Sequence, residues 1–229
     1  MVRIDHSNVM VANVAEVQEL LLQAGAKQVW DCDVFGCPCQ GFSVGKINIV
    51  LLDRSITKFL PYTPYHGEHG LWNIQINPEE STDALVKALD SRGVVRSEPQ
   101  PTLDVPAGKP FIPDVSVFSW VKVNLPGAPG CHANYIEYLK PFAGMGKVFP
   151  DAELQFVEFR LGAEDVDAAV AYYKNVFGLE PSADNSFPLG DTTFRVVKGK
   201  APVIVLRSSV ASPDLKRTIS AKAPGLVFE

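Results

Sequence analysis

Short apolar runs along the chain are followed three times by a stretch in which apolar residues recur every three or four positions. The apolar runs cover residues 4–11, 71–77 and 154–161, and the periodic stretches cover residues 14–24, 81–91 and 164–177. Runs of the first kind are typical of buried strands, and the longer period is typical of amphipathic helices. The pattern therefore predicts a strand–helix unit that occurs three times, and one such unit cannot bury its own apolar face.

The predicted helices have recognisable ends. Asn13 precedes the first helix and Glu16 follows three residues later, which is the arrangement of a capping box. Asn77, Pro78 and the two glutamates after them predict the start of the second helix. A glycine follows the last apolar position of each helix, at Gly25, Gly93 and Gly178, and glycine is the usual residue at a helix stop.

Further strands are predicted after each helix, at residues 27–34, 40–44, 46–52, 117–125, 132–139, 192–197 and 203–207. Gly36, Gly41 and Gly45 are predicted to form turns between the strands of the first unit. The fold class is α+β. Residues 1–145 are expected to form one complete pair of units, and residues 150–229 a third unit, with a fourth that begins only at residue 225. A third unit without a partner would expose an apolar sheet face, so we expect it to pack on the first pair, on a loop or on a second copy in a homodimer.

Composition and charge exclude several classes of partner. Hydrophobic residues make up 46% and charged residues 21% of the 229 residues, as in ordinary globular proteins. The net charge of −5 comes without a basic cluster, so no nucleic-acid partner is expected. No apolar run approaches the roughly 20 residues that span a membrane, and the first residues do not resemble a secretory signal. We therefore expect a cytoplasmic protein, and the absence of a glycine-rich phosphate loop predicts no nucleotide cofactor.

Two of the four cysteines are separated by one residue, in Cys37-Pro38-Cys39. Zinc sites usually need two to four residues between paired cysteines. Cys131 lies far away in the sequence. We therefore expect free thiols in a reducing compartment rather than a cysteine-rich metal site.

Three short segments share a pattern with one protein family. Ile4-Asp5-His6 is followed by Asn13 seven residues after the histidine, residues 165–179 form an alanine- and tyrosine-rich helix that ends in Phe177-Gly178-Leu179, and residues 134–139 place a glutamate in an apolar strand. These segments resemble the vicinal oxygen chelate superfamily, which includes glyoxalase I, bleomycin- and fosfomycin-resistance proteins, methylmalonyl-CoA epimerase and extradiol dioxygenases. The resemblance implies tandem βαβββ units that pair into an open curled sheet around a ligand site.

The resemblance also implies a divalent metal, which would be Fe, Mn, Ni or Zn. His6 matches the family's histidine ligand and Glu137 matches its glutamate ligand, and Glu137 would also serve as the catalytic base. Metal-dependent members use three or four ligands, and only these two match here. Each has a structural alternative, His6 as a half-buried strand residue and Glu137 as a solvated glutamate. His66 and His69, on a predicted loop, are a further metal-binding alternative.

The first strand of the second unit carries polar residues where the family would supply a histidine. We expect Trp72, Asn73 and Gln75 to contact a small-molecule ligand, with Asn73 or Gln75 assisting through its side-chain carbonyl. Three functions remain open. The first is a metal-dependent lyase, isomerase or dioxygenase acting on a small oxygen-bearing molecule. The second is a metal-free protein that binds small molecules, as resistance proteins do, and the third is a non-catalytic scaffold subunit.

Overall fold

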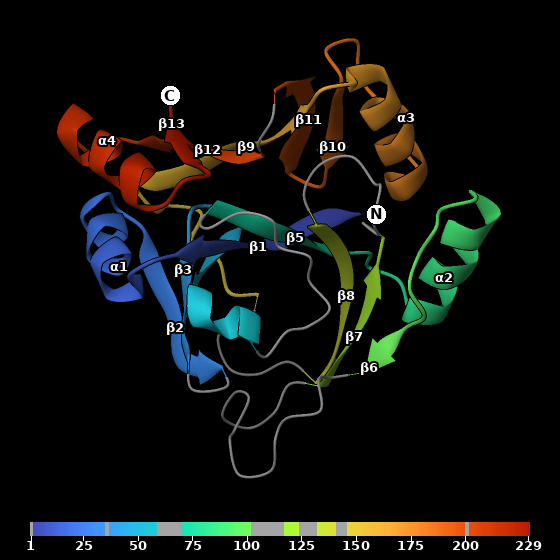
Figure 1. Ribbon diagram of the computed structural model, residues 1–229, viewed down its shortest axis with the longest axis horizontal. Coiled ribbons are helices and arrows are strands. Elements are labelled where there is room, and N and C mark those ends of the chain that lie inside the picture. Colours follow the sequence, from blue (N-terminus) through green and yellow to red (C-terminus); the bar gives the residue numbers. More distant parts are fainter. Residues whose placement is uncertain are drawn as a thin grey trace.

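The computed structural model describes residues 2–34, 37–58, 70–101, 117–123, 132–140, 146–199 and 202–229. In these ranges the chain has an α+β fold with two mixed β-sheets, one of eight strands and one of five (Figure 1). This confirms the fold class that the hydrophobic pattern and the resemblance predict.

The first sheet contains two consecutive βαβββ units in the strand order β2-β3-β4-β1-β5-β8-β7-β6. The first unit comprises β1 (Arg3–Val11), α1 (Val14–Gln23), β2 (Lys27–Val34), β3 (Cys37–Ser43) and β4 (Asn48–Asp53). The second comprises β5 (Gly70–Asn77), α2 (Thr82–Ser91), β6 (Gln100–Pro101), β7 (Val117–Lys122) and β8 (His132–Lys140). Within each unit the first and last strands are parallel, and β1 joins β5 in antiparallel pairing at the centre of the sheet.

The first sheet curls, with α1 and α2 outside the curl (Figure 1). The short 3-10 helix η1 (Arg54–Lys58) lies inside it (Figure 1). We call the concave side, opposite α1 and α2, the inner face of the sheet.

The second sheet contains two shortened units in the order β10-β11-β9-β12-β13. They comprise β9 (Leu154–Ala163), α3 (Val166–Phe177), β10 (Ser186–Leu189), β11 (Thr192–Lys198), β12 (Val203–Ser208), α4 (Pro213–Lys222) and β13 (Leu226–Phe228). β12 pairs antiparallel with β9, as β5 pairs with β1, and β13 is parallel to β12. Strand β12 therefore opens a shortened fourth unit, which continues through α4 and β13, whereas the sequence-based prediction starts this partial unit at residue 225.

One hydrophobic core joins the two sheets. It includes Val9 from β1, Ile74 from β5, Phe159 from β9 and Ile204 from β12, all fully buried. Backbones approach closely between the sheets at Gly225, where a Cβ atom would lie 2.6 Å from the backbone nitrogen of Leu71. The third unit thus buries its apolar face against the first pair, which is one of the arrangements that the sequence leaves open.

A buried hydrogen bond reinforces this packing. The Tyr135 hydroxyl on β8 donates to the Val176 carbonyl in the last turn of α3, at 2.8 Å. Burial raises the pKa of this hydroxyl well above its ordinary value, so it stays protonated and able to donate. The bond ties the second unit of the first sheet to the helix of the third unit.

The first helix has its predicted cap, whereas the second has its predicted range of about 81–91 but a different cap. The Asn13 side chain accepts from the Glu16 backbone at 3.1 Å, which confirms the predicted cap of α1. In α2 the cap is Ser81, four residues beyond the predicted Asn77. Asn77 instead accepts from the Glu79 backbone at 2.9 Å, and Glu79 adopts a φ of 55°, which a helix does not allow.

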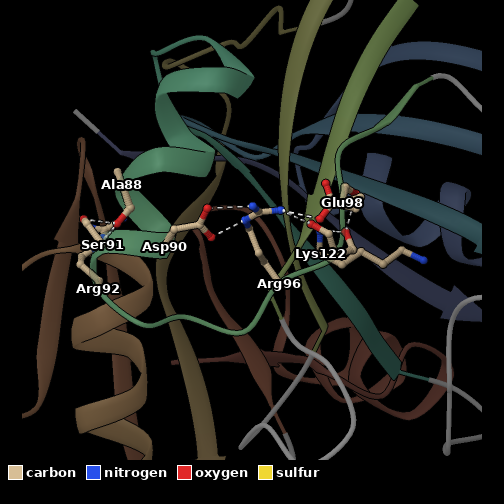
Figure 2. Close-up of polar contacts among 8 residues, drawn as sticks. Ala88, Asp90, Ser91, Arg92, Arg96, Glu98 and Lys122 are labelled. Atoms are coloured by element: carbon tan, nitrogen blue, oxygen red, sulfur yellow. Dashed lines mark hydrogen bonds and ion pairs between the residues drawn. The ribbon is translucent and has the colours of Figure 1, made fainter.

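The segment after α2 is fixed against β7. Arg96 donates to both carboxylate oxygens of Asp90, at 2.8 and 2.9 Å, and Ser97 and Lys122 exchange hydrogen bonds through the Ser97 backbone nitrogen and hydroxyl (Figure 2). An exposed ion pair of this kind contributes little by itself. Together with the bonds to Lys122, it aligns the end of α2 with β7, the strand that carries Lys122.

Gly41 does not form the turn that is predicted from the sequence. It lies in the middle of β3, opposite Trp30 of β2. A Cβ atom on Gly41 would lie 2.2 Å from the Trp30 ring, so the position accommodates the indole only because it lacks a side chain.

Candidate functional site on the inner face

Polar residues occupy the centre of the inner face, where β4, β1, β5 and β8 lie side by side. Asn48, Gln75 and Asn134 each lie between two core residues of their strand. These core neighbours are Ile47 and Ile49, Ile74 and Ile76, and Ala133 and Tyr135. Because successive strand residues point to opposite faces, the three amides point to the inner face.

The amides and His6 form one row across the four strands. Asn48 is in register with His6, His6 with Gln75, and Gln75 with Asn134. We call these four residues the polar row. All are buried, with exposed fractions between 2% and 8%, so the row is a polar layer shielded from bulk water.

Two oxygens of the polar row have no hydrogen-bond partner among the residues that the structure describes. They are Oδ1 of Asn48 and Oε1 of Gln75, which lie on the strands on either side of His6. An unsatisfied buried polar atom costs about 1–3 kcal/mol, and such atoms are uncommon in native proteins. Two of them beside one histidine suggest a site that a hydrogen-bonding ligand completes.

Next to the polar row, Asn8 and Asn73 contact each other across β1 and β5. The Asn8 Nδ2 donates to the Asn73 Oδ1 at 2.6 Å, and both side chains are buried. Asn73 is therefore paired within the protein, whereas Gln75 retains an unpartnered oxygen. Of the two candidate amides on β5, Gln75 is the better placed to bind a ligand.

A bulge in β1 brings a carboxylate to His6. The register shifts between Ile4 and His6, so Asp5 is the extra residue of β1 at this point. The Asp5 Oδ2 lies 2.6 Å from the His6 Nδ1 and 2.6 Å from the Tyr138 hydroxyl. In the sequence, Asp5 stands out only as part of the Ile4-Asp5-His6 segment, and nothing distinguishes Tyr138 from its neighbours in an apolar strand.

The electrostatics of this cluster favour Asp5 as the acceptor of its hydrogen bonds. Burial by itself raises the pKa of Asp5, but the hydrogen bonds from His6 and Tyr138 and the charge of His6 outweigh it, so the pKa is lowered. Burial and the neighbouring Asp5 raise the pKa of Tyr138 well above its ordinary value. An ionised Asp5 accepts from the His6 Nδ1–H, and with Nδ1 donating, Nε2 is the acceptor of the ring whenever the imidazole is neutral.

Glu137 lies on the other side of the sheet from His6. Its Oε2 accepts from the Thr82 backbone nitrogen at 2.8 Å and from the Thr82 hydroxyl at 2.5 Å, at the first residue of α2. The carboxylate thus satisfies the helix N-terminus. The structure does not bring Glu137 and His6 together, and their joint metal site stays a prediction.

The remaining candidates lie partly outside the described residues. Trp72 belongs to β5, but its side chain is not among those described, and His66, His69 and Cys131 lie outside the described ranges. Cys37 is a buried free thiol that accepts from the Ser55 hydroxyl at 3.0 Å. Among the described residues, no group of three or more His, Cys, Asp or Glu side chains could hold a metal ion. The described helices include none that is long and apolar enough to cross a membrane.

Neither protein-family models nor curated proteins match this sequence. Solved structures do. A hypothetical protein from Staphylococcus aureus aligns over 93% of both chains, with a TM-score of 0.67 and 13% identity. A catechol 2,3-dioxygenase aligns with 96% of this chain and 74% of its own, with a TM-score of 0.54 and 15% identity. A mutant 4-hydroxymandelate synthase from Streptomyces coelicolor aligns with 96% of this chain and 75% of its own, with a TM-score of 0.51 and 11% identity.

At these identities the comparison establishes the fold. The chain shares the fold of these proteins, and this is the fold that its resemblance to the vicinal oxygen chelate superfamily implies.

Proposed function

We propose that the inner face of the first sheet binds a small polar organic molecule by direct hydrogen bonds, without a resident metal ion. The observation that supports this most strongly is the pair of buried, unpartnered oxygens on Asn48 and Gln75. A ligand that donates to them would remove the cost of leaving them unsatisfied. The proposal corresponds to the metal-free alternative that the sequence leaves open.

The donor set of the polar row does not fit a tightly held divalent metal. It offers one imidazole nitrogen and neutral amide groups, whereas zinc and iron sites are built mainly from histidine, cysteine and carboxylates. The nearest carboxylate, Asp5, accepts from His6 and Tyr138. Glu137 accepts from Thr82 on the other face of the sheet.

Ligand-induced thermal stabilisation tests the proposal. A library of small polar molecules is screened with and without EDTA, and we expect hits whose stabilisation is insensitive to the chelator. Gln75→Leu should abolish the stabilisation. Gln40→Leu is a matched control, because it removes another buried, unpartnered amide oxygen from the opposite face of the same sheet. Stoichiometric Fe, Mn, Ni or Zn that is lost in His6→Ala would refute the metal-free proposal.

A catalytic role is the second candidate, and the Asp5–His6 contact favours it. The hydrogen bond to Asp5 orients the imidazole, so that Nε2 would take a proton from a bound ligand as a general base does. An isomerase or lyase that acts on an acidic C–H bond would use this arrangement. The step would transfer the proton from carbon to Nε2 and later return it.

Deuterium incorporation distinguishes turnover from binding. Each ligand found by thermal shift is incubated with the protein in D2O, and its C–H signals are followed by NMR. Loss of a proton signal with wild-type protein, but not with His6→Ala that still binds the ligand, would support catalysis. Unchanged spectra for every bound ligand would leave binding alone as the function.

A further inference from the structure

The polar row continues onto a fifth strand and ends at a lysine. Lys122 on β7 is in register with Asn134 of β8. Its strand neighbours Val121 and Val123 are both buried in the core. By the alternation of strand residues, Lys122 therefore points to the inner face, like Asn134.

The side chain of Lys122 extends beyond the hydrogen bonds that its backbone makes with Ser97. Figure 2 shows it extending away from α2 and from the Asp90–Arg96 pair. Burial lowers the pKa of the Lys122 ammonium, which shows that the group lies in a less polar environment than water. A cation that is partly desolvated interacts more strongly with a negative oxygen than one in bulk water does.

The extended row is polarised along its length. At one end lie acceptors, namely the unpartnered oxygens of Asn48 and Gln75 and the Nε2 of His6. At the other end lies the ammonium of Lys122, with Asn134 between them. Three strand spacings separate His6 from Lys122, about 14 Å between backbones, and a ligand between them has to span what the two side chains leave of this distance.

We propose that the inner face binds a short hydroxy or amino acid, with its carboxylate at Lys122 and its hydroxyl or amine at the acceptors of Asn48, His6 and Gln75. The inference rests on the proposed function and names its ligand class. A carboxylate at Lys122 forms a charge-assisted hydrogen bond, and the donor at the other end satisfies the unpartnered amide oxygens. A ligand with negative charge at both ends would place a carboxylate against the unpartnered oxygens of Asn48 and Gln75, where charge and dipole repel.

NMR titration of the full chain tests this ligand class with four-carbon probes that differ only in their ends. The probes are 4-hydroxybutanoate, 4-aminobutanoate, 1,4-butanediol and succinate, and the signals are the side-chain amides of Asn48 and Gln75. We expect the hydroxy and amino acids to shift both signals saturably. Succinate and the diol should bind about tenfold more weakly, because each lacks one of the two end groups.

Lys122→Met separates the inference from the proposed function. It keeps the length of the side chain and removes its charge, and Lys87→Met on the exposed side of α2 is the matched control. We expect Lys122→Met to weaken the two acids about tenfold and to leave the diol unchanged. Equal affinity of the acids for Lys122→Met and wild type would overturn the role of Lys122 and leave the proposed function standing. If no probe shifts the Asn48 and Gln75 signals of the wild type but hits from the thermal-shift library do, the ligand class is contradicted and the proposed function stands. If neither shifts them, both are contradicted.

Discussion

The contact between Glu137 and Thr82 gives the sharpest test of how the site residues are arranged. Glu137→Ala removes an acceptor of two hydrogen bonds, one from a backbone N–H at the start of α2 and one from a hydroxyl. A hydrogen bond to a charged group contributes about 1.5–3 kcal/mol when buried, and a carboxylate at a helix N-terminus adds roughly 0.3–1 kcal/mol. Because Glu137 is only partly buried, solvent reduces these values, and we expect a loss of about 2 kcal/mol in the free energy of unfolding.

A double-mutant cycle in urea isolates the contact. Thr82→Ala removes only the hydroxyl donor, so the coupling between Thr82→Ala and Glu137→Ala should be about 1 kcal/mol. For a chain of this size, 1 kcal/mol corresponds to a shift of about 2–4 °C in Tm, which is measurable. Glu137→Gln keeps an acceptor oxygen and should lose less stability than Glu137→Ala.

Unchanged stability of Glu137→Ala, together with loss of a bound metal ion, would support the predicted metal site. If Glu137→Ala unfolds like wild type within about 0.5 kcal/mol and the coupling is zero, the contact contributes nothing and the helix-capping interpretation fails. If the same variant also loses a metal ion that the wild type carries, Glu137 is a ligand. Elemental analysis of both proteins as purified reads out this second possibility.

Three further predictions concern stability. Gly41→Ala should destabilise by about 1–3 kcal/mol in urea, because the added methyl would overlap the ring of Trp30, and wild-type stability would refute the packing. Tyr135→Phe should cost about 1–3 kcal/mol, because it leaves the carbonyl of Val176 buried and unpaired, and near-UV circular dichroism should show the native packing retained. Asp5 has a lowered pKa in the fold, so it stabilises above its unfolded value of 3.8, and this contribution is lost as the pH falls through the folded pKa. Asp5→Asn should therefore be less stable near neutral pH and lose less stability below pH about 4, whereas parallel pH curves for the two proteins would contradict the assignment.

The architecture could be predicted from the sequence because each strand–helix unit shows an apolar run followed by apolar residues at helical spacing. The cap of α2 could not be predicted from the sequence. Asn77-Pro78-Glu79-Glu80 has the composition of a helix start but forms a turn, with Glu79 at positive φ. The fourth unit was recognised only at its last strand. Its first strand, β12, has the same apolar character as a closing strand, and pairing with β9 alone distinguishes the two.

The site was accessible to sequence reasoning only in part. His6, Asn73 and Gln75 do lie on the inner face, and their ligand contacts stay predictions. Asn48 was overlooked because it stands in an apolar strand, although its position between two isoleucines was the available signal. The face of the sheet to which the Glu137 side chain points depends on which face of β8 packs against α2. A strand with apolar residues on both faces does not reveal this in its sequence.

The central position of β1 and β5 has a consequence for dynamics. Both edges of each strand are paired, and the second sheet packs on their outer side through the shared core. Their amide hydrogens should exchange with solvent only in the rarest opening events, whereas those of the edge strands β2 and β6 exchange early. Most of the polar row would then belong to the part of the sheet that opens last. A ligand would meet groups that are already in place, so binding would cost little conformational entropy in the protein.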